Sequence, residues 1–234
     1  EMWLQAKWEA SYDDSIQPPN RYDYTNVVQA WAHSDSPNAA GRAIWWLRQL
    51  QEQFMDSGDS SFRPTESAYV GCLVALRRTK DPRAAAVASE QFLTEIWDRS
   101  DVDTFYPSAA LYNTVLYAWA KIGDVKKAES LLKEMCTKAP RNRYCTPDVF
   151  SFTIVVKAWC ESKHPDAPEH AERLLQMMLE FAEATGNDKV KPNVVTVTSV
   201  LNCWAKSRRP DAPARTEAIL ERLKESEELL RPNL

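Results

Sequence analysis

One apolar pattern recurs five times along the 234-residue chain, and it constrains the fold more than any other feature. In its third copy, Tyr112 is followed by Val115, Leu116 and Trp119, at intervals of three, four and seven residues. This spacing places the apolar side chains on one face of an α-helix. The copies begin at Tyr24, Tyr69, Tyr112, Phe152 and Val197, which are 45, 43, 40 and 45 residues apart. We therefore expect five helices of the same kind.

Prolines recur in phase with these expected helices. They are Pro19, Pro64, Pro107, Pro147, Pro192 and Pro232, and each of the first five lies five residues before a helix pattern begins. Because proline fixes φ and lacks an N–H group, it suits the break between two helices. Between a first helix and the next proline lies a second apolar pattern, as in Ala128, Leu131, Leu132 and Met135. Each unit is therefore predicted to be a helical hairpin.

A single hairpin cannot bury both of its apolar faces, so neighbouring hairpins must stack. We predict an all-α fold: an α-solenoid, or superhelix, of stacked helix-turn-helix repeats, with about five complete repeats and a partial one at the N-terminus. The predicted units are 21–65, 66–108, 109–148, 149–193 and 194–233, and 1–20 is interpreted as the second helix and tail of a preceding partial repeat. Most of the nine tryptophans fall on the apolar stripes, where we expect them to anchor the core between hairpins.

Composition narrows the functional classes. The chain is 44% hydrophobic and 26% charged, which is typical of a soluble globular protein. Five glycines against 14 prolines argue against a turn-rich β-sandwich and against glycine-loop nucleotide binders. The net charge of −4 excludes a uniformly basic nucleic-acid coat but not a local basic face. The segment 121–143 holds seven basic and three acidic residues, and either attracts phosphates or forms a solvated helix face.

The sequence offers no pattern that indicates catalysis. The five cysteines form no Cys-x-x-Cys motif, the three histidines lack metal-ligand spacing, and no carboxylate cluster or phosphate-binding loop is found. We therefore expect no catalytic residues, no metal, no cofactor and no small-molecule substrate. The longest uncharged run, 104–120, contains a proline and polar residues, so no membrane span is expected. The start at Glu1, without an initiator methionine or a targeting segment, is interpreted as the sign of a fragment.

The third unit carries a resemblance to a known family. From Tyr112 it reads Tyr-Asn-Thr-Val-Leu, followed by Lys-Ile-Gly at the turn and Ala-Glu-Ser-Leu-Leu-Lys-Glu-Met in the second helix. This closely resembles the pentatricopeptide repeat, and Pro-Asp-Val at 147–149 and Pro-Asn-Val at 192–194 resemble the family's usual junction. The resemblance covers residues 21–233 as five units. The units, 40 to 45 residues long, exceed the family's usual length, and we expect the extra residues in the turns and before each proline.

The resemblance implies single-stranded RNA as the partner, bound at one base per repeat by first-helix side chains, in a mitochondrion or plastid. In the family, the fifth and last residues of a repeat read the base edge, and the second residue packs against the base. The reading pairs carried over are Thr25 with Thr65, Val70 with Ser108, Asn113 with Asp148, Thr153 with Asn193, and Thr198 with Asn233. The packing positions are Tyr22, Ser67, Ala110, Phe150 and Val195.

The residue types in these pairs favour a short RNA sequence. Each fifth residue follows a stripe residue by one position, so it is turned about 100° from the buried face. Asn with Asp resembles the family's pairing for uracil, and Thr with Asn resembles its pairing for adenine. Units three to five are therefore expected to read U-A-A from 5′ to 3′. Val70 cannot hydrogen-bond, so the second unit is expected to read nothing, and Thr65 is not a usual partner for Thr25.

Alternatives are open for both the residues and the function. A Thr or Asn beside a buried stripe can also be an ordinary helix residue or a cap, and Phe150 can pack between hairpins instead of on a base. The first functional hypothesis is an RNA-binding module in organellar post-transcriptional RNA metabolism, acting alongside RNA-processing or ribosomal proteins. The alternative is a protein–protein interaction scaffold, or an organellar ribosome-associated α-solenoid, that reads no bases.

Overall fold

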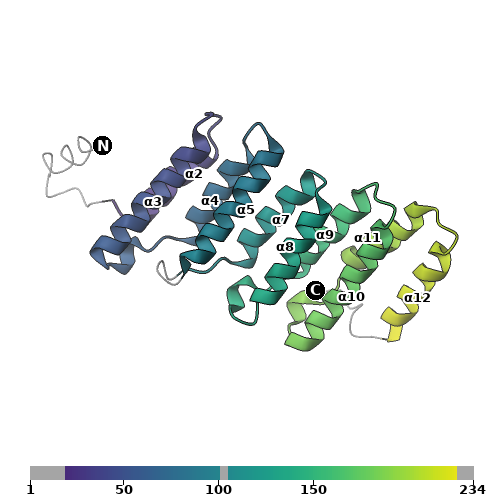
Figure 1. Cartoon of the computed structure of the whole chain (residues 1–234). Coiled ribbons are helices and arrows are strands. Elements are labelled where there is room, and N and C mark those ends of the chain that lie inside the picture. The colour runs from purple at the N-terminus through teal and green to yellow at the C-terminus, as the bar shows by residue number, and fades with distance from the viewer. Residues whose placement is uncertain (1–18, 101–104, 226–234) are drawn as a thin grey trace, which may run out of the picture.

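The computed structural model describes residues 19–100 and 105–225, whose long helices form a row of hairpins (Figure 1). The first helices of the hairpins are α2 (Arg21–Ala32), α4 (Glu66–Arg77), α7 (Ala109–Lys121), α9 (Val149–Glu161) and α11 (Val194–Ser207). The second helices are α3 (Ala39–Ser57), α5 (Pro82–Asp98), α8 (Val125–Lys138), α10 (Ala167–Thr185) and α12 (Ala212–Glu225). The partial repeat expected at 1–20 lies outside the described residues, apart from Pro19 and Asn20.

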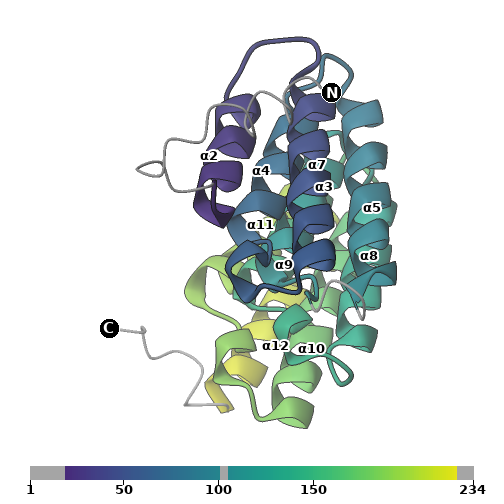
Figure 2. The same cartoon turned by 90° about the vertical axis from the view of Figure 1, so that its left-hand side faces the viewer.

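The hairpins stack so that the first helices form one layer and the second helices another. Each first helix contacts the next, from α2 through α4, α7 and α9 to α11. Each first helix after α2 also contacts the second helix of the preceding hairpin, as α9 contacts α8. The end-on view separates the layer that contains α2 and α4 from the layer that contains α3, α5 and α8 (Figure 2). The predicted α-solenoid is therefore confirmed.

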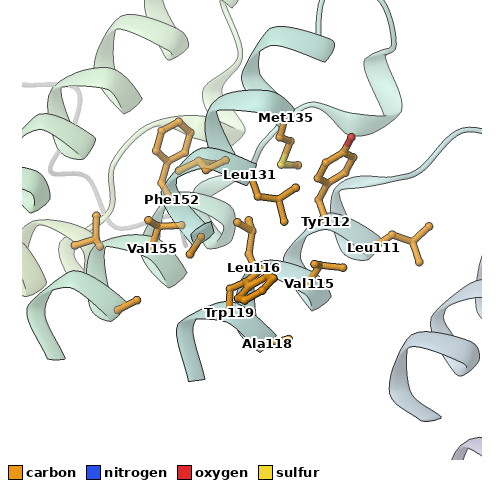
Figure 3. Packing of buried hydrophobic residues seen from close by; sticks show 14 of the residues in the cluster. Leu111, Tyr112, Val115, Leu116, Ala118, Trp119, Leu131, Met135, Phe152 and Val155 are labelled. Carbon is orange, nitrogen blue, oxygen red and sulfur yellow. The ribbon is translucent and has the colours of Figure 1, made fainter. Parts of the chain in front are cut away.

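The core is built from the apolar stripes that the sequence pattern identifies. Trp119, Trp159 and Trp204 occupy equivalent places in α7, α9 and α11 and are almost fully buried. Burial of each large apolar side chain contributes roughly 1.5–3 kcal/mol, so these residues anchor the stack. Trp31, the equivalent residue of α2, is only half-buried. Around α7 and its neighbours the packed side chains include Tyr112, Leu116, Trp119, Leu131, Met135, Phe152 and Val155 (Figure 3).

Short 3₁₀ helices account for part of the extra length of the units. They are η1 (Ser60–Phe62), η2 (Arg143–Cys145) and η3 (Asp188–Val190), and each ends two residues before a buried proline. The side chains of Asp59, Asn142 and Asn187 accept a hydrogen bond from the backbone N–H two residues later, at 2.8, 3.0 and 3.1 Å. This local capping turns the chain from a second helix into the next first helix.

Polar residues fix the start of several helices. Asn20 and Asp148 form capping boxes with the third residue of α2 and α9, which satisfies backbone N–H groups that a helix leaves unpaired. Gly123, with a φ of 79°, makes the tight turn between α7 and α8, a conformation that glycine adopts without strain. Within the described ranges, no helix combines the length and apolar character needed to cross a bilayer.

Candidate nucleic-acid interface

The second residue of each first helix points away from the core. Tyr22 is 59% exposed, Phe150 is 69% exposed and Val195 is 51% exposed, although all three are large apolar side chains. Ser67 and Ala110 are exposed at the equivalent positions of α4 and α7. The packing of Phe150 between hairpins, considered from the sequence, is therefore not found. One edge of the first-helix layer instead presents apolar side chains on which a base can stack.

The reading pair of the third unit is brought together at the junction of α7 and α9. Asn113 Nδ2 donates to Asp148 Oδ1 at 3.2 Å, and both side chains are half-buried. Ser151 Oγ lies 2.7 Å from Asn113 Oδ1 and 3.0 Å from Asp148 Oδ1. The Ser151 backbone N–H also donates to Asp148 Oδ1 at 2.9 Å. Asp148 is therefore both the N-cap of α9 and a direct partner of Asn113.

The fourth unit repeats this arrangement with different residues. Thr153 Oγ1 lies 2.7 Å from Thr196 Oγ1, and Thr196 Oγ1 donates to Asn193 Oδ1 at 3.1 Å. Asn193 caps α11 by accepting from the Thr196 backbone N–H at 2.9 Å. The pair Thr153 and Asn193 is thus connected through one hydroxyl group. Thr198 of the fifth unit is exposed on α11, and its expected partner Asn233 lies outside the described residues.

The first two units differ from this arrangement. Thr25 Oγ1 lies 3.3 Å from Thr65 Oγ1, so the pair meets, but Thr25 is only 7% exposed. Its hydroxyl donates to the Arg21 carbonyl at 2.7 Å, just as the Thr153 hydroxyl donates to the Val149 carbonyl. The expectation that Thr25 turns off the buried face is wrong, because the start of α4 lies against it. Val70 is half-buried and packs against the core, while Ser108 hydrogen-bonds Glu66. The second unit's pair therefore does not meet through a hydrogen bond.

Sequence reasoning missed two hydroxyl groups that connect the reading pairs. Ser151 and Thr196 are the third residues of α9 and α11, and both are fully buried. The equivalent positions of α4 and α7 hold Ala68 and Leu111, which cannot make these bonds. A signal was present in the spacing, since Asp-x-x-Ser and Asn-x-x-Thr resemble a helix capping box. That spacing indicates the cap, but only the stacked structure reveals the contact with the preceding hairpin.

The basic segment 121–143 does not form a single phosphate-binding face. On α8, Lys133 pairs with Glu129 at 2.6 Å and Lys138 pairs with Glu134 at 2.6 Å. Lys127 reaches Glu90 of α5 at 3.4 Å. These pairs belong to the second-helix layer and favour the interpretation as a solvated helix face. Exposed cations of the first-helix layer are instead Arg77, Lys121, Lys157 and Lys206.

Burial and hydrogen bonding shift the pKa values of some groups outside the candidate interface. Burial raises the pKa of the Cys72 thiol to about 12, which keeps it protonated at neutral pH. Burial opposes ionisation of Glu129, but hydrogen bonds from Lys133 and His170 outweigh it and lower the pKa of that carboxyl. Among residues 19–100 and 105–225, no group of three or more His, Cys, Asp or Glu side chains is placed to hold a metal ion.

Comparison with known proteins agrees with this architecture. The PPR repeat family matches residues 107–161, which include α7, α8 and α9. A chloroplastic pentatricopeptide repeat-containing protein of Arabidopsis thaliana is 26% identical over 121 residues. That alignment covers 52% of this chain, which spans 22% of the length of the relative. The repeat match, this relative and the row of helical hairpins all indicate one conclusion: the chain is similar to pentatricopeptide repeat proteins.

Proposed function

We propose that the chain is a single-stranded RNA-binding module that acts in post-transcriptional RNA metabolism in a mitochondrion or plastid. Its third, fourth and fifth units read about one base each, in the order U-A-A from 5′ to 3′. The observation that carries this proposal is the contact between the third unit's fifth and last residues, Asn113 and Asp148, at 3.2 Å. The activity is binding and includes no chemical step. Organellar RNA-processing or ribosomal proteins are its proposed neighbours.

The chemistry of the third unit suits a uracil edge. Uracil presents carbonyl oxygens that accept hydrogen bonds and one ring N–H that donates. The Asn113 amide carries N–H donors, and the Asp148 carboxylate carries acceptor oxygens. Hydrogen bonds from Asn113 and Ser151 converge on Oδ1 of Asp148, which fixes the carboxylate plane before RNA arrives. Such preorganisation reduces the entropy lost on binding.

Stacking and charge support the same ligand. Phe150 and Val195 lie on the first turns of α9 and α11, beside the capping residues Asp148 and Asn193. A base read at one unit therefore lies next to exposed apolar side chains, and stacking of a base contributes roughly 1–3 kcal/mol. Exposed cations on the same helices, among them Lys157 and Lys206, supply attraction for phosphates. Because the whole chain is acidic, this attraction is local and will weaken strongly with salt.

One observation favours the second candidate, a scaffold that holds a fixed partner without reading bases. In the first two units the fifth residue is the buried Thr25 or the apolar Val70, so neither offers a polar group to a base. A protein–protein scaffold or a ribosome-associated solenoid needs no reading pairs. This candidate predicts that exchange of the third unit's pair changes nothing in RNA preference.

Titration with labelled single-stranded RNAs at fixed salt separates the two candidates. The wild-type chain is expected to bind an RNA with a U-A-A core more tightly than a scrambled RNA. The double variant Asn113→Thr with Asp148→Asn gives the third unit the residues of the fourth, and should move its preference from uracil to adenine. A matched control is Val70→Ala, in a unit that is proposed to read nothing. Equal affinities for every RNA, unchanged in the double variant, would refute base reading.

A further inference from the structure

We propose that η2 carries an additional RNA contact outside the reading pairs, in which Arg143 binds a phosphate and Tyr144 stacks on a base or ribose. This inference rests on the proposed RNA-binding function and adds a site to it. The site lies between the third and fourth units, four residues before the reading residue Asp148. Its occupant is the nucleotide that passes from the third to the fourth unit.

The Tyr144 ring is exposed and is held by its neighbours. The side chain is 58% exposed, so packing in the core does not fix the position of its ring. The Arg143 guanidinium lies over the ring at 5.2 Å from its centroid, and Arg143 Nη2 donates to the phenol oxygen at 3.4 Å. The Tyr144 backbone N–H donates to Asn142 Oδ1 at 3.0 Å. Because Asn142 and Cys145 are buried, the backbone beneath the ring is anchored.

A second Arg–Tyr pair has the same geometry and lies at a position expected to pack on a base. The Arg21 guanidinium is 4.9 Å from the centroid of the Tyr22 ring, and Arg21 Nη2 donates to its phenol oxygen at 3.1 Å. This pair lines a hollow together with Asn20, Ser60 and Ser61, so it also adjoins a 3₁₀ helix. The chain therefore uses one side-chain arrangement twice beside its interhairpin turns. The repeat pattern assigns a role to Tyr22 only.

The charge around Tyr144 is positive. The hydrogen bond from Arg143, the charge of Arg143 and the charge of Arg63 lower the pKa of the Tyr144 phenol. Arg63, which follows η1, therefore adds to the positive charge felt by this ring. Arg141 is exposed two residues before Arg143. A guanidinium binds phosphate through its planar set of N–H donors, and an aromatic ring beside it accepts a base of any type. Polyanionic single-stranded RNA fits both properties.

The extra contact predicts an effect on affinity that does not depend on sequence. Tyr144→Ala should weaken binding of U-A-A and scrambled RNAs alike by about tenfold, the loss expected for one stacked base. Tyr144→Phe keeps the ring and should retain affinity. Arg143→Ala should reduce the slope of log affinity against log salt by about one, as expected for one lost phosphate contact. The control Arg173→Ala removes an exposed arginine of α10, in the second-helix layer, and should leave affinity and slope unchanged.

Titrations of the same RNAs distinguish this inference from base reading. Circular dichroism first verifies that each variant is folded. Because the Tyr144 side chain is exposed, we expect its substitution to leave the fold intact. If U-A-A is preferred but Tyr144→Ala binds as the wild type does, the additional contact is refuted and base reading stands. If no sequence is preferred but Tyr144→Ala is weaker on every RNA, the additional contact is supported and base reading is refuted. A wild-type chain that binds no RNA refutes both.

Discussion

Units three and four differ from units one and two at the third residue of the helix that follows. Where α9 and α11 begin, the buried hydroxyls of Ser151 and Thr196 join a capping residue to the preceding hairpin. Where α4 and α7 begin, Ala68 and Leu111 fill the same place with apolar atoms. In the first case the polar pair is connected and partly open to solvent. In the second, Thr25 is buried and Val70 packs against the core.

In units three and four, a third residue hydrogen-bonds both members of the proposed reading pair. A hydroxyl group beneath the pair restrains both side chains, because it bonds the cap on one helix and the polar side chain on the other. Without it, in the first unit, Thr25 and Thr65 meet only through a 3.3 Å contact between their own hydroxyl groups. We therefore propose that base reading in this chain requires a set of three residues drawn from two adjacent hairpins.

The largest effect on stability is expected from a core substitution in the units that contain the connected pairs. Trp159 is fully buried in α9 and stacks on His170 at 3.7 Å between ring centroids. Trp159→Ala should lower the free energy of unfolding by about 3–5 kcal/mol, measured by denaturant titration. Because repeats contact only their neighbours, hydrogen exchange should rise around α9 more than around α2. The exposed Lys157→Ala on the same helix should change stability by less than about 0.5 kcal/mol.

A reciprocal exchange between the first and fourth units will sharpen the comparison. Thr65→Asn with Ala68→Thr gives the first unit the connected set of the fourth, around the existing Thr25. Asn193→Thr with Thr196→Ala gives the fourth unit the residues of the first. We expect the first exchange to create an adenine preference of about tenfold and the second to abolish one of similar size, as for one lost set of base contacts. Competition binding with RNAs that differ at one base measures both, and no change in either preference contradicts the three-residue requirement.

Removal of one hydroxyl tests the same idea with a smaller change. Ser151→Ala removes the bond to Asn113 and the side-chain part of the α9 capping box, so it should destabilise the fold by about 1 kcal/mol. It should also reduce the preference for uracil at the third unit while leaving adenine preference at the fourth unit intact. The control Ser130→Ala, exposed on α8, should affect neither. A destabilised variant with full uracil preference would limit Ser151 to a capping role.

The smallest effect concerns the second helices beneath the connected pairs. Glu129 of α8 contacts Lys133 at 2.6 Å and His170 of α10 at 2.9 Å, and its pKa lies below the ordinary 4.5. A lowered pKa means that the ionised carboxylate stabilises the fold above pH 4.5, and that this stabilisation is lost as the pH falls through the folded-state value. Glu129→Gln should therefore cost up to about 1 kcal/mol at neutral pH and less in acid. Thermal unfolding across pH measures this, with the more exposed Glu134→Gln as the control.

The sequence was sufficient for the fold and insufficient for the details of the site. Helix starts such as Ala109 and Val149, and the buried tryptophans Trp119 and Trp159, follow from local periodicity and capping. The burial of Thr25 does not follow, because it depends on how closely α4 approaches α2. The ion pairs of α8 likewise involve Glu90 and His170 from neighbouring hairpins. Contacts between hairpins depend on geometry that no single unit's sequence contains.

The 3₁₀ turns have a consequence for how regularly the first helices follow one another. Successive first helices remain in direct contact even though the units vary in length. The extra residues, including η1, η2 and η3, lie in the connections that run from a second helix to the next first helix. The spacing of the first helices therefore depends on how these helices pack and not on the length of the turns. A chain of this design tolerates insertions of unequal size between its hairpins and, under the proposed function, still presents its side chains in step with consecutive nucleotides.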